Sequence, residues 1–188
     1  MIEYYGKLPQ YVYIKNEKFF INSDYRIFIN FEMEMQGKNI RKAIENALKS
    51  FYPALFRICE MQLLDEAIDK FIWFYHCGRE EYKNQEIANK KGKKASQIFN
   101  YKYDCDLICG SFLLYANIDL HKYCHWWKFK EVWNSLPSDC EFLKIKSYRA
   151  YDGNEKEMIE LKEYYKLPPT EIEIQEQIRK DKIYEAFK

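Results

Sequence analysis

The chain has 188 residues, of which 30 are basic and 29 acidic, so its formal net charge at pH 7 is +1. This balance removes the global electrostatic argument for a nucleic-acid or anionic-membrane partner, either of which would need a local charged patch. One domain with a sizeable core is expected at this length, and no apolar run approaches the roughly 20 residues that span a bilayer. The N-terminus shows no apolar run of signal-peptide length either, so we expect a cytoplasmic protein whose six cysteines are reduced.

Local signals predict a β-hairpin and two helices in the first third of the chain. Apolar residues alternate weakly on both sides of a polar break at residues 15–18, which is typical of a short hairpin. Asn22, Ser23 and Asp24 then offer N-cap side chains for a helix that ends at Gly37. A second helix is predicted over residues 39–51, before Pro53, from the apolar spacing of Ile40, Ala43, Ile44, Ala47, Leu48 and Phe51.

The clearest helical pattern runs from Leu63 to Gly78. Its expected apolar stripe consists of Leu64, Ile68, Phe71, Ile72 and Tyr75. Residues 79–97 contain the run KKGKK and almost no apolar side chains, which predicts an exposed and mobile basic linker.

The second half of the chain predicts a series of helices with short connections. Apolar spacing favours a helix over residues 98–116 and a further unit that begins near Asp119. A helix capped by Ser138 or Asp139 and a charged helix over 154–166 follow. After two prolines, Thr170 and Glu173 form a capping-box pattern for a last helix. We therefore predict a mainly α fold: a single helical domain over 1–167 with a small N-terminal β-hairpin and a linker at about 79–97, then a tail helix over 168–188.

The stretch YCHWWKFKEVWNSLP, residues 123–137, concentrates three tryptophans in one predicted helix. On a helical wheel, one side carries Leu120, Tyr123, Cys124 and Trp127, and the adjoining side carries Trp126, Phe129, Trp133 and Leu136. This apolar arc is wider than a helix on a small domain usually buries. We expect most of these rings to fill the core and one or two tryptophans to stand at a partner-binding surface.

Several cysteines and histidines lie close enough in sequence to suggest a metal site or a metal-dependent enzyme: His76, Cys77, Cys105, Cys109, His121, Cys124 and His125. Structural zinc sites favour short knuckles, however, and the chain has no CxxC pair. Phosphate-binding loops of the GxxxxGK[ST] or GxGxxG kind are also absent. The sequence therefore predicts no catalytic, cofactor-binding or metal-binding residues.

Five stretches, taken in order, resemble one protein family: FYPALF (51–56), FIWFYHCG (71–78), YDCDLICGSFLLYANIDL (103–120), HWWKFKEVWNSLP (125–137) and FLKIKSYRAYD (142–152). This is the family of small bacteriophage proteins named after the gene-15 product of a temperate phage of Gram-positive hosts. The resemblance covers about residues 8–167, and HWWKF followed by YR carries it most strongly. Members of the family are encoded in the tail module just ahead of the tape measure protein and are regarded as tail assembly chaperones or their partners.

The resemblance implies a non-enzymatic tail assembly chaperone or accessory protein that binds the tape measure protein in the host cytoplasm. A second tail chaperone and a homo-oligomer are further partners that it suggests, and a membrane is not among them. We expect aromatic rings to line or buttress the partner groove, with Arg149 at its polar rim; the rings are Trp126, Trp127, Phe129, Trp133, Trp73 and Phe74. The alternative is a nucleic-acid-associated protein that uses the linker lysines Lys90, Lys91, Lys93 and Lys94, which the near-zero net charge disfavours.

Overall fold

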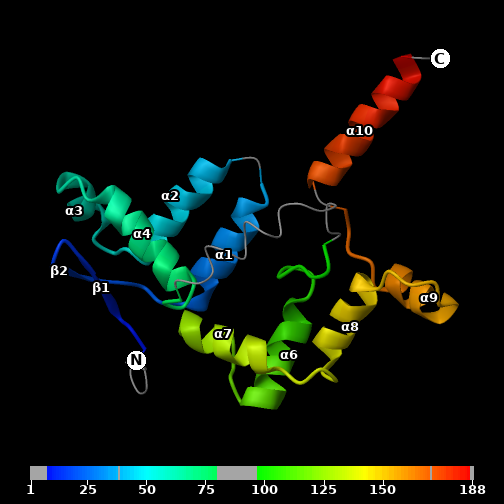
Figure 1. Ribbon diagram of the computed structural model, residues 1–188, viewed down its shortest axis with the longest axis horizontal. Coiled ribbons are helices and arrows are strands. Elements are labelled where there is room, and N and C mark those ends of the chain that lie inside the picture. Colours follow the sequence, from blue (N-terminus) through cyan, green and yellow to red (C-terminus); the bar gives the residue numbers. More distant parts are fainter. Residues whose placement is uncertain (1–7, 38, 80–96, 170, 187–188) are drawn as a thin grey trace.

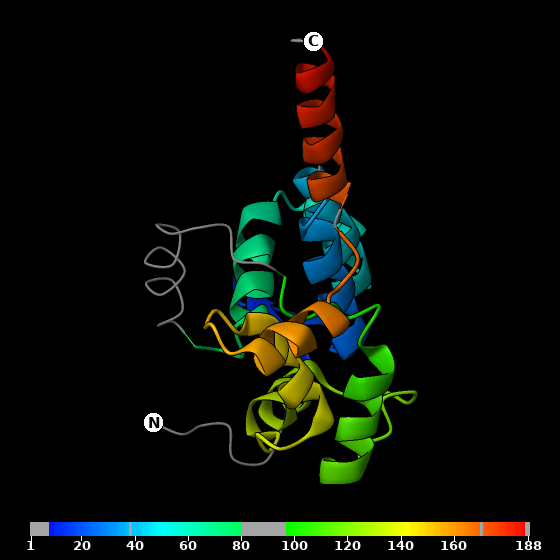
Figure 2. The same cartoon turned by 90° about the vertical axis from the view of Figure 1, so that its right-hand side faces the viewer.

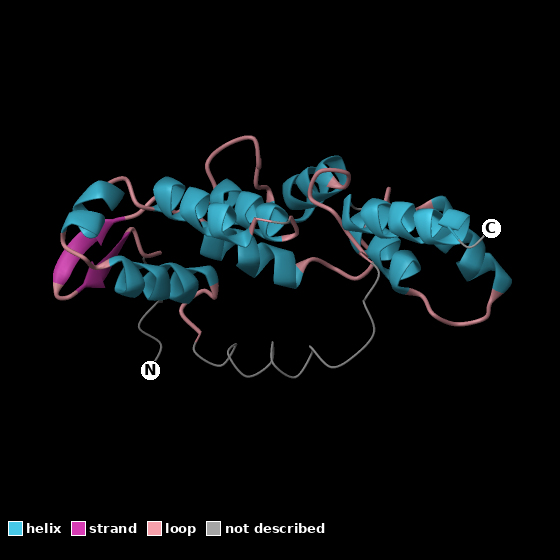
Figure 3. Cartoon of the chain, turned by 90° about the horizontal axis from the view of Figure 1, so that it is seen from above, coloured by secondary structure: helices cyan, strands magenta, loops and turns pink. Residues whose placement is uncertain are grey.

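The computed structural model describes residues 8–37, 39–79, 97–169 and 171–186. It confirms a mainly α fold: these residues form one two-stranded antiparallel hairpin and nine helices (Figure 1). Seen from above, the hairpin lies at one end of the molecule and the C-terminal end of the chain at the other (Figure 3). The expected linker at 80–96 lies outside the described residues.

The predicted hairpin is present, with a turn shorter than its polar break suggested. Strand β1 (Tyr11–Ile14) pairs with β2 (Glu17–Phe20), and Ile14 lies opposite Glu17. Lys15 and Asn16 both have positive φ, 43° and 66°, as a two-residue type I′ turn requires. Val12, Ile14 and Phe19 face the core, whereas Tyr11, Tyr13 and Phe20 remain exposed.

Helices α1 (Tyr25–Met35) and α2 (Ile40–Phe51) follow their local signals closely. The Asp24 carboxylate accepts a hydrogen bond from the Arg26 amide at 2.9 Å, and the Asn39 side chain accepts one from the Lys42 amide at 3.0 Å. Each side chain thus satisfies a backbone donor that the first helical turn leaves free. Beyond Pro53 lies a short helix, α3 (Leu55–Glu60), that the sequence reading did not predict.

Helix α4 (Leu64–Tyr75) forms where expected but buries a different face. Its buried residues are Ala67, Phe71 and Phe74, whereas Leu64 and Ile72 from the predicted stripe are exposed. The helix is apolar on most of its circumference, so periodicity alone could not decide which side meets the core. Helix α4 packs against the hairpin, α2 and α3, and these contacts determine which of its sides is buried.

The second half of the chain differs from its prediction at three helix starts. Helix α6 (Cys105–Ala116) begins at residue 105 rather than 98, because Asn100 and Asp104 hydrogen-bond each other's backbone in a turn. Residues 120–124 are not helical, and α7 (Trp126–Ser135) begins six residues after Leu120. Helix α8 (Glu141–Ala150) has Cys140 at its N-cap, with no side-chain hydrogen bond from the predicted Ser138 or Asp139.

Two more helices complete the described chain: α9 (Lys156–Tyr164) and α10 (Glu171–Ala186). Helix α10 projects away from the rest of the molecule (Figure 2), and its Ile174, Ile178 and Ile183 are exposed. The capping box proposed at Thr170 lies outside the described residues.

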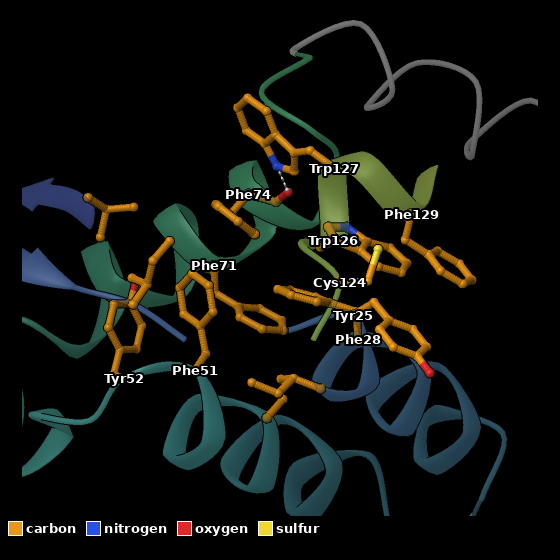
Figure 4. Packing of buried hydrophobic residues seen from close by; sticks show 14 of the residues in the cluster. Tyr25, Phe28, Phe51, Tyr52, Phe71, Phe74, Cys124, Trp126, Trp127 and Phe129 are labelled. Carbon is orange, nitrogen blue, oxygen red and sulfur yellow. Dashed lines mark hydrogen bonds between the residues drawn. The ribbon is translucent and has the colours of Figure 1, made fainter. Parts of the chain in front are cut away.

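The interior is one continuous cluster built mainly from aromatic rings (Figure 4). Phe28 of α1 lies at its centre, stacked on Trp126 of α7 with ring centroids 4.8 Å apart and on Phe71 and Phe74 of α4 at 5.6 and 5.5 Å. One turn further along α7, Phe129 stacks on Trp126 at 5.6 Å and on Phe112 of α6 at 4.8 Å. These stacks join the N-terminal helices to α6 and α7 through a single core.

Candidate partner-binding site

The rings expected to line a partner groove lie inside the protein instead. Trp126, Phe129 and Phe74 are 0% exposed and Trp127 is 6% exposed, while Trp73 and Trp133 are half-buried. Trp127 contacts both Trp73 and Phe74, with ring centroids 5.6 and 5.4 Å away. Neighbouring rings of the same chain cover the faces of the buried side chains, so these rings can support a partner surface from beneath but cannot line it.

The two adjacent tryptophans complete the C-terminal end of α4. Trp126 donates its indole N–H to the Tyr75 carbonyl at 2.8 Å. Figure 4 shows the second bond, in which Trp127 donates to the Phe74 carbonyl at 2.9 Å. The remaining carbonyls of the last turn, at residues 72 and 73, accept from the backbone amides of His76 and Gly78. All four carbonyls that a helix end normally leaves free therefore have partners. The tryptophan pair is a structural clasp between α7 and α4.

Gly78 supplies the backbone conformation and the space that this clasp needs. Its φ is +72°, and a Cβ placed there would lie 3.1 Å from Cη2 of Trp127 and 3.2 Å from Cζ2 of Trp73. We expect Gly78→Ala to lower the free energy of unfolding by about 1–2 kcal/mol from the left-handed conformation alone. Gly110→Ala is the matched control, since nothing lies within 4 Å of its Cβ; inside a helix it should stabilise by about 0.5–1 kcal/mol. Urea denaturation of both variants tests whether the free energy of unfolding falls for Gly78→Ala and rises for Gly110→Ala.

His125 caps α7 with an imidazole nitrogen. Its Nδ1 accepts a hydrogen bond from the Trp127 amide at 3.1 Å, so the proton resides on Nε2, which donates to the Pro9 carbonyl at 3.0 Å. The two capping residues Asp24 and His125 also form an antiparallel bridge, in which the Tyr25 and Trp126 amides donate across to the opposite segment. The His125 side chain thus ties α7 to the segment that leads into the hairpin, and the backbone bridge ties α7 to α1.

Protonation of His125 should destabilise the fold. Burial lowers the pKa of this imidazole below its usual 6.5, only partly offset by the hydrogen bond to Pro9 and by Glu131. The unfolded chain then binds the proton more tightly, so stability present above pH 6.5 is lost as the pH falls toward the folded pKa. We expect the free energy of unfolding to decrease below pH 6.5, and His125→Asn to flatten this dependence, because asparagine caps a helix without titrating. Urea denaturation at a series of pH values would measure both slopes.

Arg149 forms a buried ion pair with Asp104. Its guanidinium donates to both carboxylate oxygens of Asp104, at 2.8 and 3.0 Å, and to the Tyr165 carbonyl at 2.6 Å. The Arg149 and Asp104 side chains are 9% and 2% exposed. These donors hold α8, the start of α6 and the end of α9 together. Arg149 also lines the groove between the end of α9 and the start of α10, so its place at a partner rim stays a prediction.

A second polar cluster, which the sequence did not predict, joins Tyr75 and Tyr101 to Glu32. The Tyr75 and Tyr101 hydroxyls donate to the two oxygens of the Glu32 carboxylate at 2.8 and 2.7 Å. Burial, followed by the nearby Glu32 charge, raises the pKa of Tyr101 far above its usual value of 10. These three residues are distant in the chain and carry no spacing signal, so only the fold brings them together.

The cysteines and histidines that suggested a metal site all lie in the part of the chain that the structure describes. All six cysteines are free thiols there, and no group of three or more His, Cys, Asp or Glu side chains is arranged to hold a metal ion. Cys105 and Cys109 are the nearest approach to such a group, with sulfurs 3.9 Å apart. Burial raises the pKa of the Cys109 thiol to about 11, the neighbouring Cys105 adding to the effect.

Besides the exposed hairpin rings, two further surfaces of the described residues are open and apolar. One is the outer side of α6, where Leu113 and Leu114 are exposed beside Gly110. The other is a groove of about 580 Å³ between the end of α9 and the start of α10, whose apolar wall includes Leu167, Pro169 and Ile174. The sequence predicted a helix here but no surface role for it; a glycine inside an otherwise apolar helix was the available signal.

The architecture defines a mainly helical protein with a closed aromatic core and uncovered apolar surface on α6. Residues 5–168 match the family model described as "Bacteriophage Gp15 protein", and the chain belongs to that family. It is a bacteriophage protein. No curated protein and no solved structure gave a significant match. Within the described residues, no helix is long and apolar enough to cross a membrane.

Proposed function

We propose that this protein is a non-enzymatic tail assembly chaperone or accessory protein that binds the tape measure protein in the host cytoplasm. Membership of the Gp15 family supports a role in the phage life cycle. The observation that carries the binding role is α6: a helix with one charged residue among twelve whose outer side nevertheless remains uncovered. Exposed apolar surface of this kind marks sites of protein association.

A tape measure protein offers a suitable counterpart. It is a long, largely helical chain whose apolar seams are exposed until the tail tube closes around it. A companion that covers those seams needs apolar side chains on rigid elements and polar residues around them. A rigid aromatic core with apolar side chains left on its surface meets this requirement.

Co-purification tests the proposal. Tagged fragments of the long helical protein encoded beside this gene would be co-expressed with the full chain, and retention measured after a high-salt wash. We expect at least one fragment to retain the protein in stoichiometric amounts, and nuclease treatment to leave the retained amount unchanged. An unrelated coiled-coil protein with the same tag is the control. The proposal fails if no fragment retains more protein than this control does.

The nucleic-acid alternative makes a different prediction in the same experiment. Retention through phosphate contacts falls steeply with salt and disappears after nuclease treatment. Its lysines, Lys90, Lys91, Lys93 and Lys94, lie outside the described residues. The near-zero net charge and the exposed leucines of α6 favour protein binding.

A further inference from the structure

Helix α6 has the composition of a fully buried helix but only part of its surface is buried. Its sequence, CDLICGSFLLYA, contains Asp106 as its single charged residue. Ile108, Ser111 and Phe112 are buried on the side facing α7 and α8, whereas Leu113 and Leu114 are 55% and 76% exposed. Figure 2 shows the helix, in green, along the outer edge of the molecule. Helices that are apolar all round are normally covered all round, so a second body should cover this face.

The exposed face has a notch at its centre. Asp106, Gly110 and Leu114 are spaced four residues apart and so follow one another along the same side of the helix. A Cβ added to Gly110 would meet no atom within 4 Å. The backbone is therefore bare between the carboxylate and the leucine, which lets another helix approach more closely than a side chain would allow.

The chemistry of the exposed side of α6 favours binding of a helix over binding of an extended segment. An added strand gains affinity from free backbone donors and acceptors, and the middle of α6 has none, because its amides and carbonyls bond within the helix. Side-chain packing is what remains, as in the docking of an amphipathic helix. Asp106 is exposed and forms no ion pair with any described residue, so a cation on the occupant would find it unneutralised.

We propose that α6 is the docking surface for an amphipathic helix of the tape measure protein, an inference that rests on the proposed function. The incoming helix crosses α6 at Gly110, places apolar side chains over Leu113 and Leu114, and brings a lysine or arginine to Asp106. The clasp tryptophans do not contact it. Their part is to hold α7, against which α6 packs.

A glycine substitution separates binding from folding. Gly110→Leu fills the notch with a side chain that favours helix, so circular dichroism and urea denaturation should show a fold at least as stable as the wild type. Retention of the tape measure fragment should nevertheless fall about tenfold or more, the size expected when the centre of an interface is blocked. Phe56→Glu is the matched control: Phe56 is 69% exposed on α3, away from this face, and its loss should leave retention unchanged.

Charge reversal tests the second contact. Asp106→Lys should weaken retention, and replacing the facing lysine or arginine of the fragment by glutamate should restore it. A photo-crosslinking residue at position 114 should label the tape measure fragment, whereas the same residue at position 56 should not.

The outcomes show whether the α6 docking surface or the proposed function itself is wrong. If the wild type is retained by a fragment and Gly110→Leu is retained equally well, the α6 assignment is wrong while the proposed function stands. If position 114 labels a second copy of this chain in place of the fragment, α6 is an interface between copies and the assignment is also wrong. If no fragment retains the wild type, the proposed function fails and this inference fails with it.

Discussion

Replacing Trp126 by alanine is expected to lower the free energy of unfolding by about 3–5 kcal/mol, the usual cost of removing a large buried ring. Trp126 is fully buried and stacks on Phe28, Tyr75 and Phe129. The change leaves a cavity at the junction of α1, α4 and α7, and it also removes the donor that satisfies the Tyr75 carbonyl. Urea denaturation followed by circular dichroism measures the loss.

Two further variants separate packing from hydrogen bonding. Trp126→Phe keeps an aromatic ring in the stack but removes the indole N–H, so it should cost clearly less than alanine. Leu114→Ala is the exposed control and should change stability by less than about 0.5 kcal/mol. A Trp126→Ala variant as stable as this control would show that the ring does not fill the core. Binding experiments on tryptophan variants report on folding first, which is why a glycine on α6 makes the better binding probe.

The first helices were predictable because their signals are local. Asp24 and Asn39 are the residue types that cap helices, and each accepts the expected backbone hydrogen bond. The same two helices end at Met35 and Phe51, shortly before Gly37 and Pro53, and Tyr52 before the proline is extended, as residues that precede proline usually are. In the hairpin, alternation of apolar residues indicated the two strands but not their inward face, which carries Val12, Ile14 and Phe19.

The helix starts in the second half of the chain were predicted wrongly because they depend on residues distant in the sequence. Helix α6 begins at residue 105 because Asp104 is held in a turn with Asn100 and by Arg149, which lies 45 residues later in the chain. Helix α7 is capped by a histidine, which is outside the usual set of capping residues and is held by the Pro9 carbonyl. Neither arrangement leaves a short-range pattern, so apolar spacing extended both predicted helices too far toward their N-termini.

The candidate site was missed for a related physical reason. Tryptophan is both a good core filler and a frequent interface anchor, so the segment around Trp126 and Trp127 was equally compatible with either role. What decided between them was the end of α4, whose free carbonyls lie where two indole donors can reach them. Once those rings belong to the core, the uncovered side of α6 is the stronger surface for a partner.

Breaking the buried ion pair is expected to be as damaging as breaking the aromatic core. Asp104→Asn leaves the Arg149 guanidinium buried without a counter-charge, which typically costs about 3–5 kcal/mol. The carboxylate accepts hydrogen bonds from Arg149 and from the Asn100 amide, so the start of α6 should also lose order. Arg149→Met should be similarly destabilising, because it leaves the Asp104 carboxylate as the unpaired buried charge.

The double variant identifies the origin of this loss. Asp104→Asn combined with Arg149→Met removes both charges, so it should be far less unstable than the sum of the single changes, with a coupling of about 1–3 kcal/mol in urea denaturation. It should not reach wild-type stability, since the Tyr165 carbonyl and its neighbours lose the guanidinium donors that now link α8 to α9. Additive effects would mean that the two charges do not depend on each other. The pair also positions α6, so the single variants should weaken the retention of a tape measure fragment, and the double variant should recover part of it.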